Sequence, residues 1–279
     1  MAASATARAL IDDGESRLAA AGIDTARLDA ELLLAAAAGV TRSEIVAGLV
    51  DPLAGAELYE AWLSRRAERE PLAYITGRQG FRRIELRVDP RVLIPRPETE
   101  LLVAVAKVDR PCGILDVATG SGAVALALAD ELPDATITAA DISADALAVA
   151  RANADALGAA GRVTFFESDL LDEIEGVFDA IVANLPYVVA DEIDGLQAEV
   201  ARFEPRLALD GGPDGFELVR RLAVAAPAQL KPGGTIALEI GQDQALETEA
   251  ILRAAGFVDT ARHEDLNGIE RVVSGRKRR

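Results

Sequence analysis

From residue 113 onward, short strand-like runs alternate with helical patterns, and this alternation constrains the fold more than any other feature of the chain. The strand-like runs are rich in apolar and β-branched residues, and most of the segments between them have helical apolar spacing. Such an alternation predicts a parallel, doubly wound α/β sheet that binds ligands at the carboxyl ends of its strands. The runs are GILDVAT, TITAADI, RVTFFES, FDAIVAN, GGTIALEIG, FVDTARHED and IERVVSG.

The last two runs are joined by the short segment LNG, with no helical pattern between them. Parallel neighbours need a long crossover, whereas antiparallel neighbours need only a turn. We therefore expect these two runs to form an antiparallel hairpin at the edge of the sheet.

The first third of the chain is helical in character. Ala, Leu, Glu and Arg dominate it, and one stretch repeats apolar residues at helical spacing until Gly39. We predict a small all-α domain over residues 1–72, with a helix that ends before Pro71. Short polar residues that accept a backbone N–H are candidate helix caps here: Asp24, Ser43 and Asp51.

Residues 73–95 have scattered glycines and alternating apolar positions, which predict a β-hairpin linker. Residues 96–279 then form the α/β domain. The length of 279 residues and the 50% apolar content suit one large unit plus a smaller one.

Charge and composition exclude several classes of protein. The net charge is −17, and the only basic cluster is the terminal GRKRR, so we expect no stable binding to nucleic acid. Charge, Gly or Pro interrupts every long apolar run, which argues against a membrane span. The amino terminus lacks a secretory signal pattern, and the single cysteine, Cys112, allows no intrachain disulfide. These features predict a cytoplasmic protein, and we expect Cys112 to be inert packing.

A glycine-rich loop follows the first strand-like run, in LDVATGSGAVALALA. Gly120 and Gly122 would let a ligand approach the backbone, and Asp141 follows at the spacing of a carboxylate that holds ribose hydroxyls. The pattern also fits the dinucleotide fingerprint, so a nicotinamide-dependent dehydrogenase is an alternative, as is an ordinary tight turn. Asp116 favours S-adenosylmethionine, because a carboxylate there can meet a cationic amino-acid group and would repel a pyrophosphate.

The tetrapeptide Asn184-Leu185-Pro186-Tyr187 ends the run FDAIVAN. Methylation of an amide or exocyclic amine is difficult because the nitrogen lone pair is delocalised. The Asn184 side-chain oxygen and the Leu185 carbonyl could accept the two N–H bonds and hold the nitrogen near a methyl donor. Pro186 stiffens the backbone, and Tyr187 offers a flat face to a planar group. The alternative is a turn with a buried tyrosine.

The chain resembles the release factor glutamine methyltransferases, the HemK/PrmC family of class I S-adenosylmethionine-dependent methyltransferases, from about residue 10 to residue 274. The matching blocks are REPLAYITGRQGF (69–81), VLIPRPETELLV (92–103), DVATGSGAVALALA (116–129), IVANLPYV (181–188), FEPRLALDGGPDGFELVR (203–220), LKPGGTIALEIGQDQ (230–244) and DLNGIERVV (265–273). The resemblance implies a Rossmann-like, seven-stranded methyltransferase domain with a terminal antiparallel hairpin.

Two residues depart from the family pattern. Leu185 stands where the family usually has Pro, and Asn-Leu-Pro-Tyr is typical of ribosomal-RNA adenine dimethyltransferases, which are the main alternative. Ala118 stands where the family usually has Gly. We expect the turn to tolerate the extra methyl group at a φ that alanine can adopt.

The resemblance also implies roles for individual residues and a partner. The cofactor would be S-adenosylmethionine, with S-adenosylhomocysteine as product, and no metal is implied. The partner would be a class I release factor, which is docked by the helical domain and modified on its Gly-Gly-Gln loop. We expect the enzyme to be a monomer. The implied cofactor residues are Asp116, Ala118, Thr119, Gly120, Ser121, Gly122, Asp141, Asp169, Leu170 and Asn184. The implied substrate residues are Arg96, Glu98 and the catalytic tetrapeptide Asn184, Leu185, Pro186 and Tyr187.

Some residues keep two interpretations. Arg96, framed by two prolines, either shapes the substrate entrance or forms a salt bridge between the domains. Glu239 either supports the site from the fifth strand or is a core carboxylate bonded to backbone. A protein that binds the cofactor without catalysis is a further alternative to the enzyme.

Overall fold

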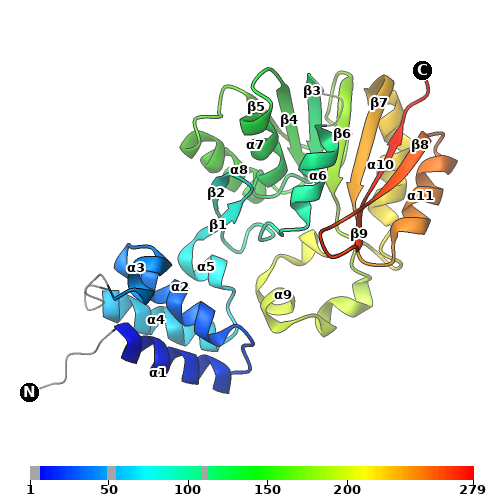
Figure 1. Cartoon of the computed structure of the whole chain (residues 1–279). Helices are drawn as coiled ribbons and strands as arrows, with labels where there is room; N and C mark the ends of the chain where they lie inside the picture. Colours follow the sequence, from blue (N-terminus) through cyan, green and yellow to red (C-terminus); the bar gives the residue numbers. More distant parts are fainter. Residues whose placement is uncertain (1–6, 49–54, 108–111) are drawn as a thin grey trace, which may run out of the picture. The chain divides into compact units, whose positions relative to one another are not determined.

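The computed structural model describes residues 7–48, 55–107 and 112–279 (Figure 1). The chain divides into two compact units, which we describe separately. The helical unit comprises Met1–Gly77 with Gln197–Phe203, and the sheet unit comprises Arg78–Leu196 with Glu204–Arg279.

The helical unit is built around a small apolar core. Leu18, Leu33, Leu34, Tyr59 and Leu63 are fully buried in it. This core forms because each helix turns one apolar stripe inward. The helices are α1 (Ala7–Ala20), α2 (Ala26–Ala38), α3 (Arg42–Val46), α4 (Ala56–Ala67), α5 (Leu72–Thr76) and, from much later in the chain, α9 (Ala198–Phe203).

The helix ends agree only in part with the sequence predictions. Gly39 terminates α2 in a left-handed conformation, φ 69°, as predicted. The predicted helix caps Asp24 and Ser43 were wrong. The N-cap residue of α2 is Thr25, and that of α3 is Thr41. Thr41 forms a capping box with Glu44, a pattern that satisfies two backbone N–H groups. Asp51 lies outside the described residues.

Buried ion pairs attach α9 to the helical unit. Arg66 is 6% exposed and donates to Asp29 at 2.7 Å and to Glu199 at 3.0 Å. Arg69 reaches the other oxygen of Glu199 at 2.7 Å. Glu199 therefore neutralises two arginines from α4 and the residues just after it, which explains why residues 197–203 belong to this unit.

The sheet unit contains a seven-stranded sheet with the strand order β5-β4-β3-β6-β7-β9-β8 (Figure 1). Its first five strands along the chain are mutually parallel, and β9 is antiparallel to both β7 and β8. This confirms the predicted α/β class and the terminal hairpin. The strands are β3 (Gly113–Val117), β4 (Thr136–Asp141), β5 (Val163–Glu167), β6 (Phe178–Asn184), β7 (Leu230–Glu239), β8 (Val258–Glu264) and β9 (Glu270–Arg276).

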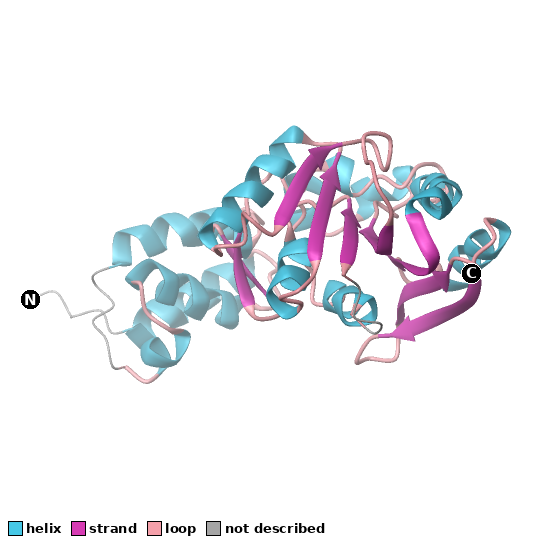
Figure 2. Cartoon of the chain, turned by 90° about the horizontal axis from the view of Figure 1, so that it is seen from above, coloured by secondary structure: helices cyan, strands magenta, loops and turns pink. Residues whose placement is uncertain are grey.

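Helices cover both faces of this sheet, as Figure 2 shows from above. One face carries α6 (Thr99–Ala106), α7 (Ala123–Glu131) and α8 (Ala144–Ala156). The apolar core between these helices and the sheet includes Ile114. The other face carries α10 (Glu217–Gln229) and α11 (Ala245–Ala254). The apolar core on this face includes Leu115, the residue that follows Ile114 in β3. Successive strand residues point to opposite faces, so both layers form from continuous apolar runs.

A separate two-stranded antiparallel sheet pairs β1 (Arg78–Phe81) with β2 (Ile84–Arg87). Phe81 and Leu86 are buried in the core that underlies α6 and α7. The Asn153 side chain of α8 bonds the backbone N–H of Arg87 at 2.8 Å and its carbonyl at 3.0 Å. This hairpin is therefore held firmly within the sheet unit.

The structure also tests two expectations from the sequence, on membrane-spanning segments and on Cys112. None of the described helices combines the length and the apolar character that crossing a membrane requires. Cys112 is exposed, so the expectation that it packs in the interior was wrong. Its backbone N–H donates to Asp179 at 3.1 Å, and its carbonyl accepts the Thr136 N–H at 2.7 Å.

Candidate active site

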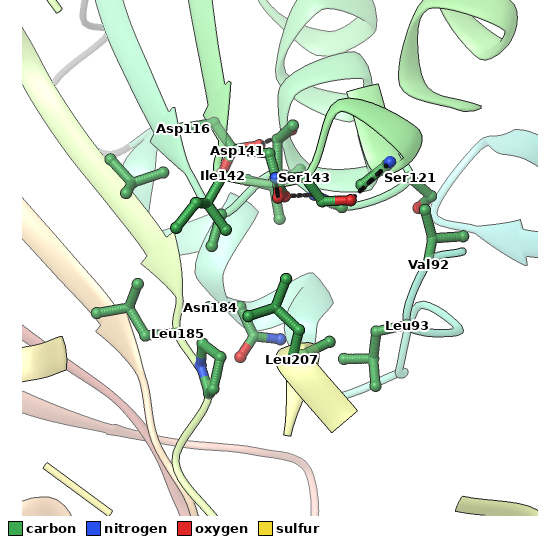
Figure 3. A pocket seen from close by; sticks show the side chains of 18 of the residues that line it. Val92, Leu93, Asp116, Ser121, Asp141, Ile142, Ser143, Asn184, Leu185 and Leu207 are labelled. Atoms are coloured by element: carbon green, nitrogen blue, oxygen red, sulfur yellow. Dashed lines mark hydrogen bonds between the residues drawn. The ribbon is translucent and has the colours of Figure 1, made fainter. Parts of the chain in front are cut away.

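A cavity opens at the carboxyl ends of β3, β4 and β6, the edge of the sheet where the sequence predicts a ligand site (Figure 3). Parallel strands bring their carboxyl ends to one edge, so residues that are far apart in the chain meet there. The predicted site residues that line the cavity are Arg96, Asp116, Ala118, Thr119, Gly120, Ser121, Asp141, Asp169, Leu170, Asn184, Leu185 and Pro186. Within the described chain, the lining does not include Glu98, Gly122 or Tyr187.

Asp116 lies under the glycine turn and is 1% exposed. It accepts a hydrogen bond from the Thr119 hydroxyl at 2.6 Å and one from the backbone N–H of Ala125, in the first turn of α7, at 3.1 Å. Burial raises the pKa of the Asp116 carboxyl to about 7, although these two hydrogen bonds lower it. A nearby cation would restore its charge.

Gly120 presents an open backbone to the cavity. It adopts φ 56°, and a Cβ built on it would meet no atom of the described residues within 4 Å. Gly122, at φ 83°, has the opposite surroundings, because a Cβ there would press on Leu126 at 3.0 Å and Ala150 at 3.3 Å. The first glycine therefore leaves room for a ligand, and the second allows α7 and α8 to pack.

Ala118 departs from our expectation. We expected a φ that alanine tolerates, but Ala118 has φ 58°, in the left-handed region that favours glycine. The turn is fixed by the Thr119 N–H, which donates to the Ala140 carbonyl at 3.0 Å. The turn geometry is therefore kept at the expense of local strain.

Asp141 ends β4 and is 9% exposed. Its two oxygens accept the backbone N–H groups of Gly120, at 2.8 Å, and Ser143, at 2.9 Å. Burial raises the pKa of the carboxyl in spite of these bonds. A carboxylate oxygen has more than one acceptor site, so Asp141 keeps capacity for hydroxyl donors.

Apolar side chains form another part of the wall. Ile142 is 51% exposed and Leu207 is 59% exposed, although both are large apolar residues. Leu170, at φ 52°, lines the same cavity, and Asp169 pairs with Arg221 at 2.8 Å. Exposed apolar surface in a cavity is typical of a site for a flat ring.

This set of groups fits S-adenosylmethionine better than a dinucleotide. Asp116 and Asp141 suit an ammonium group and a pair of ribose hydroxyls, and the open backbone at Gly120 allows close approach. In a dinucleotide site the helix N-terminus receives the pyrophosphate. Here the Asp116 carboxylate already occupies the Ala125 N–H of α7, and its charge would repel a phosphate. The dehydrogenase alternative is therefore disfavoured.

Asn184 is the last residue of β6, and its side chain faces the cavity (Figure 3). The Asn184 Nδ2 donates to the Thr99 hydroxyl at 3.3 Å. Leu185 is 2% exposed and packs in the core beneath α10, while Pro186 also lines the cavity. With Nδ2 engaged, the carboxamide oxygen is the part of Asn184 available to a ligand.

The backbone after the tetrapeptide is held by a second loop. The Tyr187 carbonyl accepts the Gln244 side-chain N–H at 3.0 Å. Val188 bonds to the DGG segment and to the residue before it. Its N–H donates to the Leu209 carbonyl at 2.9 Å, and its carbonyl accepts the Gly211 N–H at 2.8 Å. Burial raises the pKa of the Tyr187 phenol. The DGGPDG block that we noted in the sequence thus supports the tetrapeptide.

Arg96 lines the cavity and forms an ion pair with Glu204. Both residues belong to the sheet unit. The Glu204 side chain is almost fully buried, and its Oε2 has no hydrogen-bond partner among the described residues. Burial raises the pKa of Glu204, and Arg96 opposes that rise. Arg96 therefore neutralises a buried acid, which leaves its predicted substrate role untested.

Several lining residues were missed by sequence reasoning. Some follow predicted residues directly, such as Ile142 and Ser143 after Asp141, and could have been inferred from position alone. Others come from the loop after α9, which has no periodic signal, although the block FEPRLAL was part of the resemblance. The missed residues include Val92, Leu93, Pro95, Ile142, Ser143, Ser168, Pro205, Leu207, Ala208, Leu218 and Arg221.

Comparisons with known proteins identify two family domains and the fold. The chain matches the model of the PrmC N-terminal domain over residues 9–77 and that of the methyltransferase small domain over residues 97–202. A crystal structure of a methyltransferase from Pyrococcus furiosus superposes with a TM-score of 0.53 at 18% identity, covering 70% of this chain and 89% of that one. At this identity the likeness shows the fold alone.

Full-length relatives define the family. A release factor glutamine methyltransferase of Moorella thermoacetica is 46% identical over 258 residues, 90% of this chain and 91% of that protein. One of Geobacter sulfurreducens is 41% identical over 276 residues, 97% of this chain and 96% of that protein. With such identity over nearly the whole length of both relatives, this chain belongs to the release factor glutamine methyltransferase family.

Proposed function

We propose that this protein uses S-adenosylmethionine to methylate the side-chain amide nitrogen of a glutamine, that of the Gly-Gly-Gln motif of class I peptide chain release factors. One observation carries the proposal. The Asn184 carboxamide lines the same cavity as Asp116 and Asp141, the two carboxylates suited to the cofactor. The names of the relatives supply the substrate class.

The cofactor is held by residues at three strand ends. Asp141 accepts the ribose hydroxyls, and residues 118–122 surround the methionine end above Asp116. Asp169 and Leu170 border the adenine, next to the exposed Ile142. When bound, S-adenosylmethionine supplies an electrophilic methyl group on a sulfonium.

The tetrapeptide orients the substrate amide. The Asn184 Oδ1 and the Leu185 carbonyl accept its two N–H bonds, which fixes the nitrogen and favours a tetrahedral arrangement over the planar amide. Pro186 limits Leu185 to extended conformations, so the carbonyl keeps its direction. An N-methylated amide cation is strongly acidic, so water takes the surplus proton and no side-chain base is needed.

The domain roles follow from the same proposal. The helical domain, residues 1–72, docks the release factor, residues 73–95 link the domains, and residues 96–279 carry out the transfer. Arg96 and Glu98 shape the substrate entrance, and Tyr187 contacts the amide plane. A cytoplasmic location, a monomeric state and the lack of stable nucleic-acid binding remain predictions.

One assay tests the function. The protein is incubated with methyl-labelled cofactor and a class I release factor, and the label is mapped by mass spectrometry. We expect it on the Gly-Gly-Gln glutamine and none on a release factor whose glutamine is replaced by alanine. Asn184→Ala should reduce turnover far more than cofactor affinity. Equal losses of both would contradict the role of Asn184.

The same assay addresses the second candidate, an adenine amino methyltransferase, which the sequence Asn-Leu-Pro-Tyr favours. Ribosomal RNA and DNA are offered in parallel with the release factor. Label in nucleic acid alone would replace the proposed substrate, whereas cofactor binding without any transfer would indicate a non-catalytic module.

A further inference from the structure

Behind Asn184 lies a short chain of interacting side chains, in which Thr99 also lines the cavity and Glu239 does not. The Asn184 Nδ2 donates to the Thr99 hydroxyl at 3.3 Å. Burial raises the pKa of the Glu239 carboxyl, and the Thr99 hydroxyl, as a hydrogen-bond donor, lowers it. Thr99, in the first turn of α6, is 4% exposed, and Glu239, at the end of β7, is 3% exposed. Asn184 and Glu239 are register partners on the neighbouring strands β6 and β7.

The number of protons that each side chain can donate determines the direction of these bonds. An ionised carboxylate only accepts, and a threonine hydroxyl has one proton to donate. Once Thr99 gives that proton to Glu239, its oxygen can only accept from Asn184. The side-chain NH2 of Asn184 must then face Thr99, which leaves the carboxamide oxygen as the group that can accept from a ligand.

We propose that Thr99 and Glu239 are positioning residues that fix the side-chain amide of Asn184 with its oxygen toward the substrate. This inference rests on the proposed function, because only an acceptor at that point can bind a substrate N–H. In the flipped amide the NH2 group would face the substrate nitrogen, and donor would meet donor. Preorganised acceptors of this kind contribute to rate because they need no rearrangement during the reaction.

The surroundings of Glu239 are consistent with this role. Its Oε2 has no hydrogen-bond partner within the described residues, so the Thr99 bond is a main support of its charge. Burial raises its pKa to about 7. Glu98 raises it further, whereas Arg271 from β9 and Arg96 lower it, and the Tyr187 phenol lies within range of its charge.

This arrangement makes the orientation of Asn184 depend on pH. A protonated Glu239 can donate to Thr99, which frees the threonine proton for the Asn184 oxygen and allows the amide to flip. The deprotonated form is the one that fixes the productive orientation. Turnover should therefore rise as the pH increases through about 7, on account of this group.

The test compares three variants with the wild-type enzyme. Thr99→Val removes the hydroxyl at nearly constant volume, Thr99→Ser keeps it, and Glu239→Gln removes the charge that sets the direction. For each variant, kcat, KM for the release factor, the cofactor Kd by calorimetry and kcat against pH are measured. The side-chain NH2 resonances of Asn184, assigned by their loss in Asn184→Ala, report the amide directly in ¹⁵N-labelled protein.

We expect Thr99→Val to lower kcat by roughly ten-fold or more, the worth of about one hydrogen bond at the reacting group, with the cofactor Kd nearly unchanged. Thr99→Ser should recover most of the loss. Glu239→Gln should lower kcat and remove the rise near neutral pH, because glutamine can support either amide orientation. The Asn184 NH2 resonances should shift in Thr99→Val and not in Thr99→Ser.

Two outcomes would overturn the inference. One is a Thr99→Val enzyme that keeps its kcat, and the other is a Glu239→Gln enzyme whose pH profile matches the wild type. If Thr99→Val fails to fold, Glu239→Gln and Thr99→Ser still decide the question. If the wild-type protein methylates no release factor, the proposed function fails, while the Asn184 resonances still show whether Thr99 orients the amide.

Discussion

Gly211 lies directly against Tyr187. A Cβ on Gly211 would come within 2.7 Å of the Tyr187 Cα and within 2.9 Å of the Pro186 carbonyl oxygen. Both neighbours are backbone atoms, which cannot rotate away as a side chain can. The position of the tetrapeptide therefore depends on the absence of a side chain at residue 211.

We predict that Gly211→Ala displaces the tetrapeptide and lowers kcat by about ten-fold or more, since small misplacements of reacting groups have large effects on rate. The cofactor Kd should change little, because all the implied cofactor residues except Asn184 lie at the ends of other strands. Steady-state kinetics and calorimetry measure the two quantities. Gly161→Ala is the matched control, since a Cβ there meets nothing within 4 Å among the described residues and φ is unrestrictive. Equal kinetics for the two variants would contradict the prediction.

Ala118→Gly should stabilise the protein. The left-handed conformation costs an alanine about 1–2 kcal/mol, and the freer unfolded chain of a glycine costs about 0.5–1 kcal/mol, so the net gain is about 0.5–1 kcal/mol. Urea unfolding without cofactor measures it. The same substitution at Ala148, exposed in the middle of α8, should instead destabilise by about 1 kcal/mol. Destabilisation by both variants would show that the turn at Ala118 is not strained.

The buried acid Asp116 should make stability depend on pH. Its folded pKa of about 7 exceeds the ordinary value of 3.8, so the folded state holds the proton more tightly. The stabilisation is complete below about pH 4 and is lost as the pH rises to about 7. Asp116→Asn, which can still accept from Thr119 and Ala125, should reduce this loss by on the order of 2 kcal/mol.

Unfolding free energies at several pH values between 4 and 8, without cofactor, check this prediction. Glu239 also has a pKa of about 7 and acts in the same direction, so part of the slope should remain in Asp116→Asn. If the unfolding free energy of Asp116→Asn falls with rising pH as steeply as that of the wild type, Asp116 keeps its charge when buried.

Arg96 and Glu204 should be energetically coupled. Arg96→Ala leaves the buried Glu204 carboxylate without its partner and should destabilise by roughly 1–3 kcal/mol, since Arg96 itself is partly screened by solvent. The loss should be smaller at pH 5 than at pH 8, because loss of Arg96 raises the pKa of Glu204 further and the acid can take up a proton.

A double-mutant cycle in urea measures the coupling. Glu204→Gln removes the buried charge, so it should rescue most of the stability of Arg96→Ala. Additive effects of the two changes would argue that Arg96 serves the substrate rather than Glu204. Release-factor KM in Arg96→Ala, compared with the rescued double variant, then separates the two roles.

The fold was largely predictable from the sequence. Strands such as β3 and β6 are continuous apolar runs bounded by polar residues, and helices such as α8 have clear periodicity and caps, so local signals and tertiary packing agree. The helix α9 was not predictable, because six residues with no buried side chain carry little periodic signal. Its place is set by ion pairs of Glu199 with Arg66 and Arg69, residues far away in the sequence.

The site was predictable to the extent that strand ends determine it. Asp141 and Asn184 follow apolar runs directly, so their meeting at one edge follows from the parallel topology. The left-handed φ of Ala118 was not foreseeable from composition, because the turn is held by bonds from Thr119 to other strands. The link from Asn184 through Thr99 to Glu239 was equally hidden, since it joins three separate elements.

The placement of α9 has a consequence for the evolution and dissection of this chain. Because the polypeptide leaves the sheet unit at residue 197 and re-enters it at residue 204, a single genetic crossover after Gly77 cannot transplant the amino-terminal module intact. A truncated protein that starts at Arg78 would keep Glu199 but lose both guanidinium groups that neutralise it. The two modules therefore have to be inherited together, because residues 197–203, encoded more than a hundred codons after Gly77, complete the amino-terminal module.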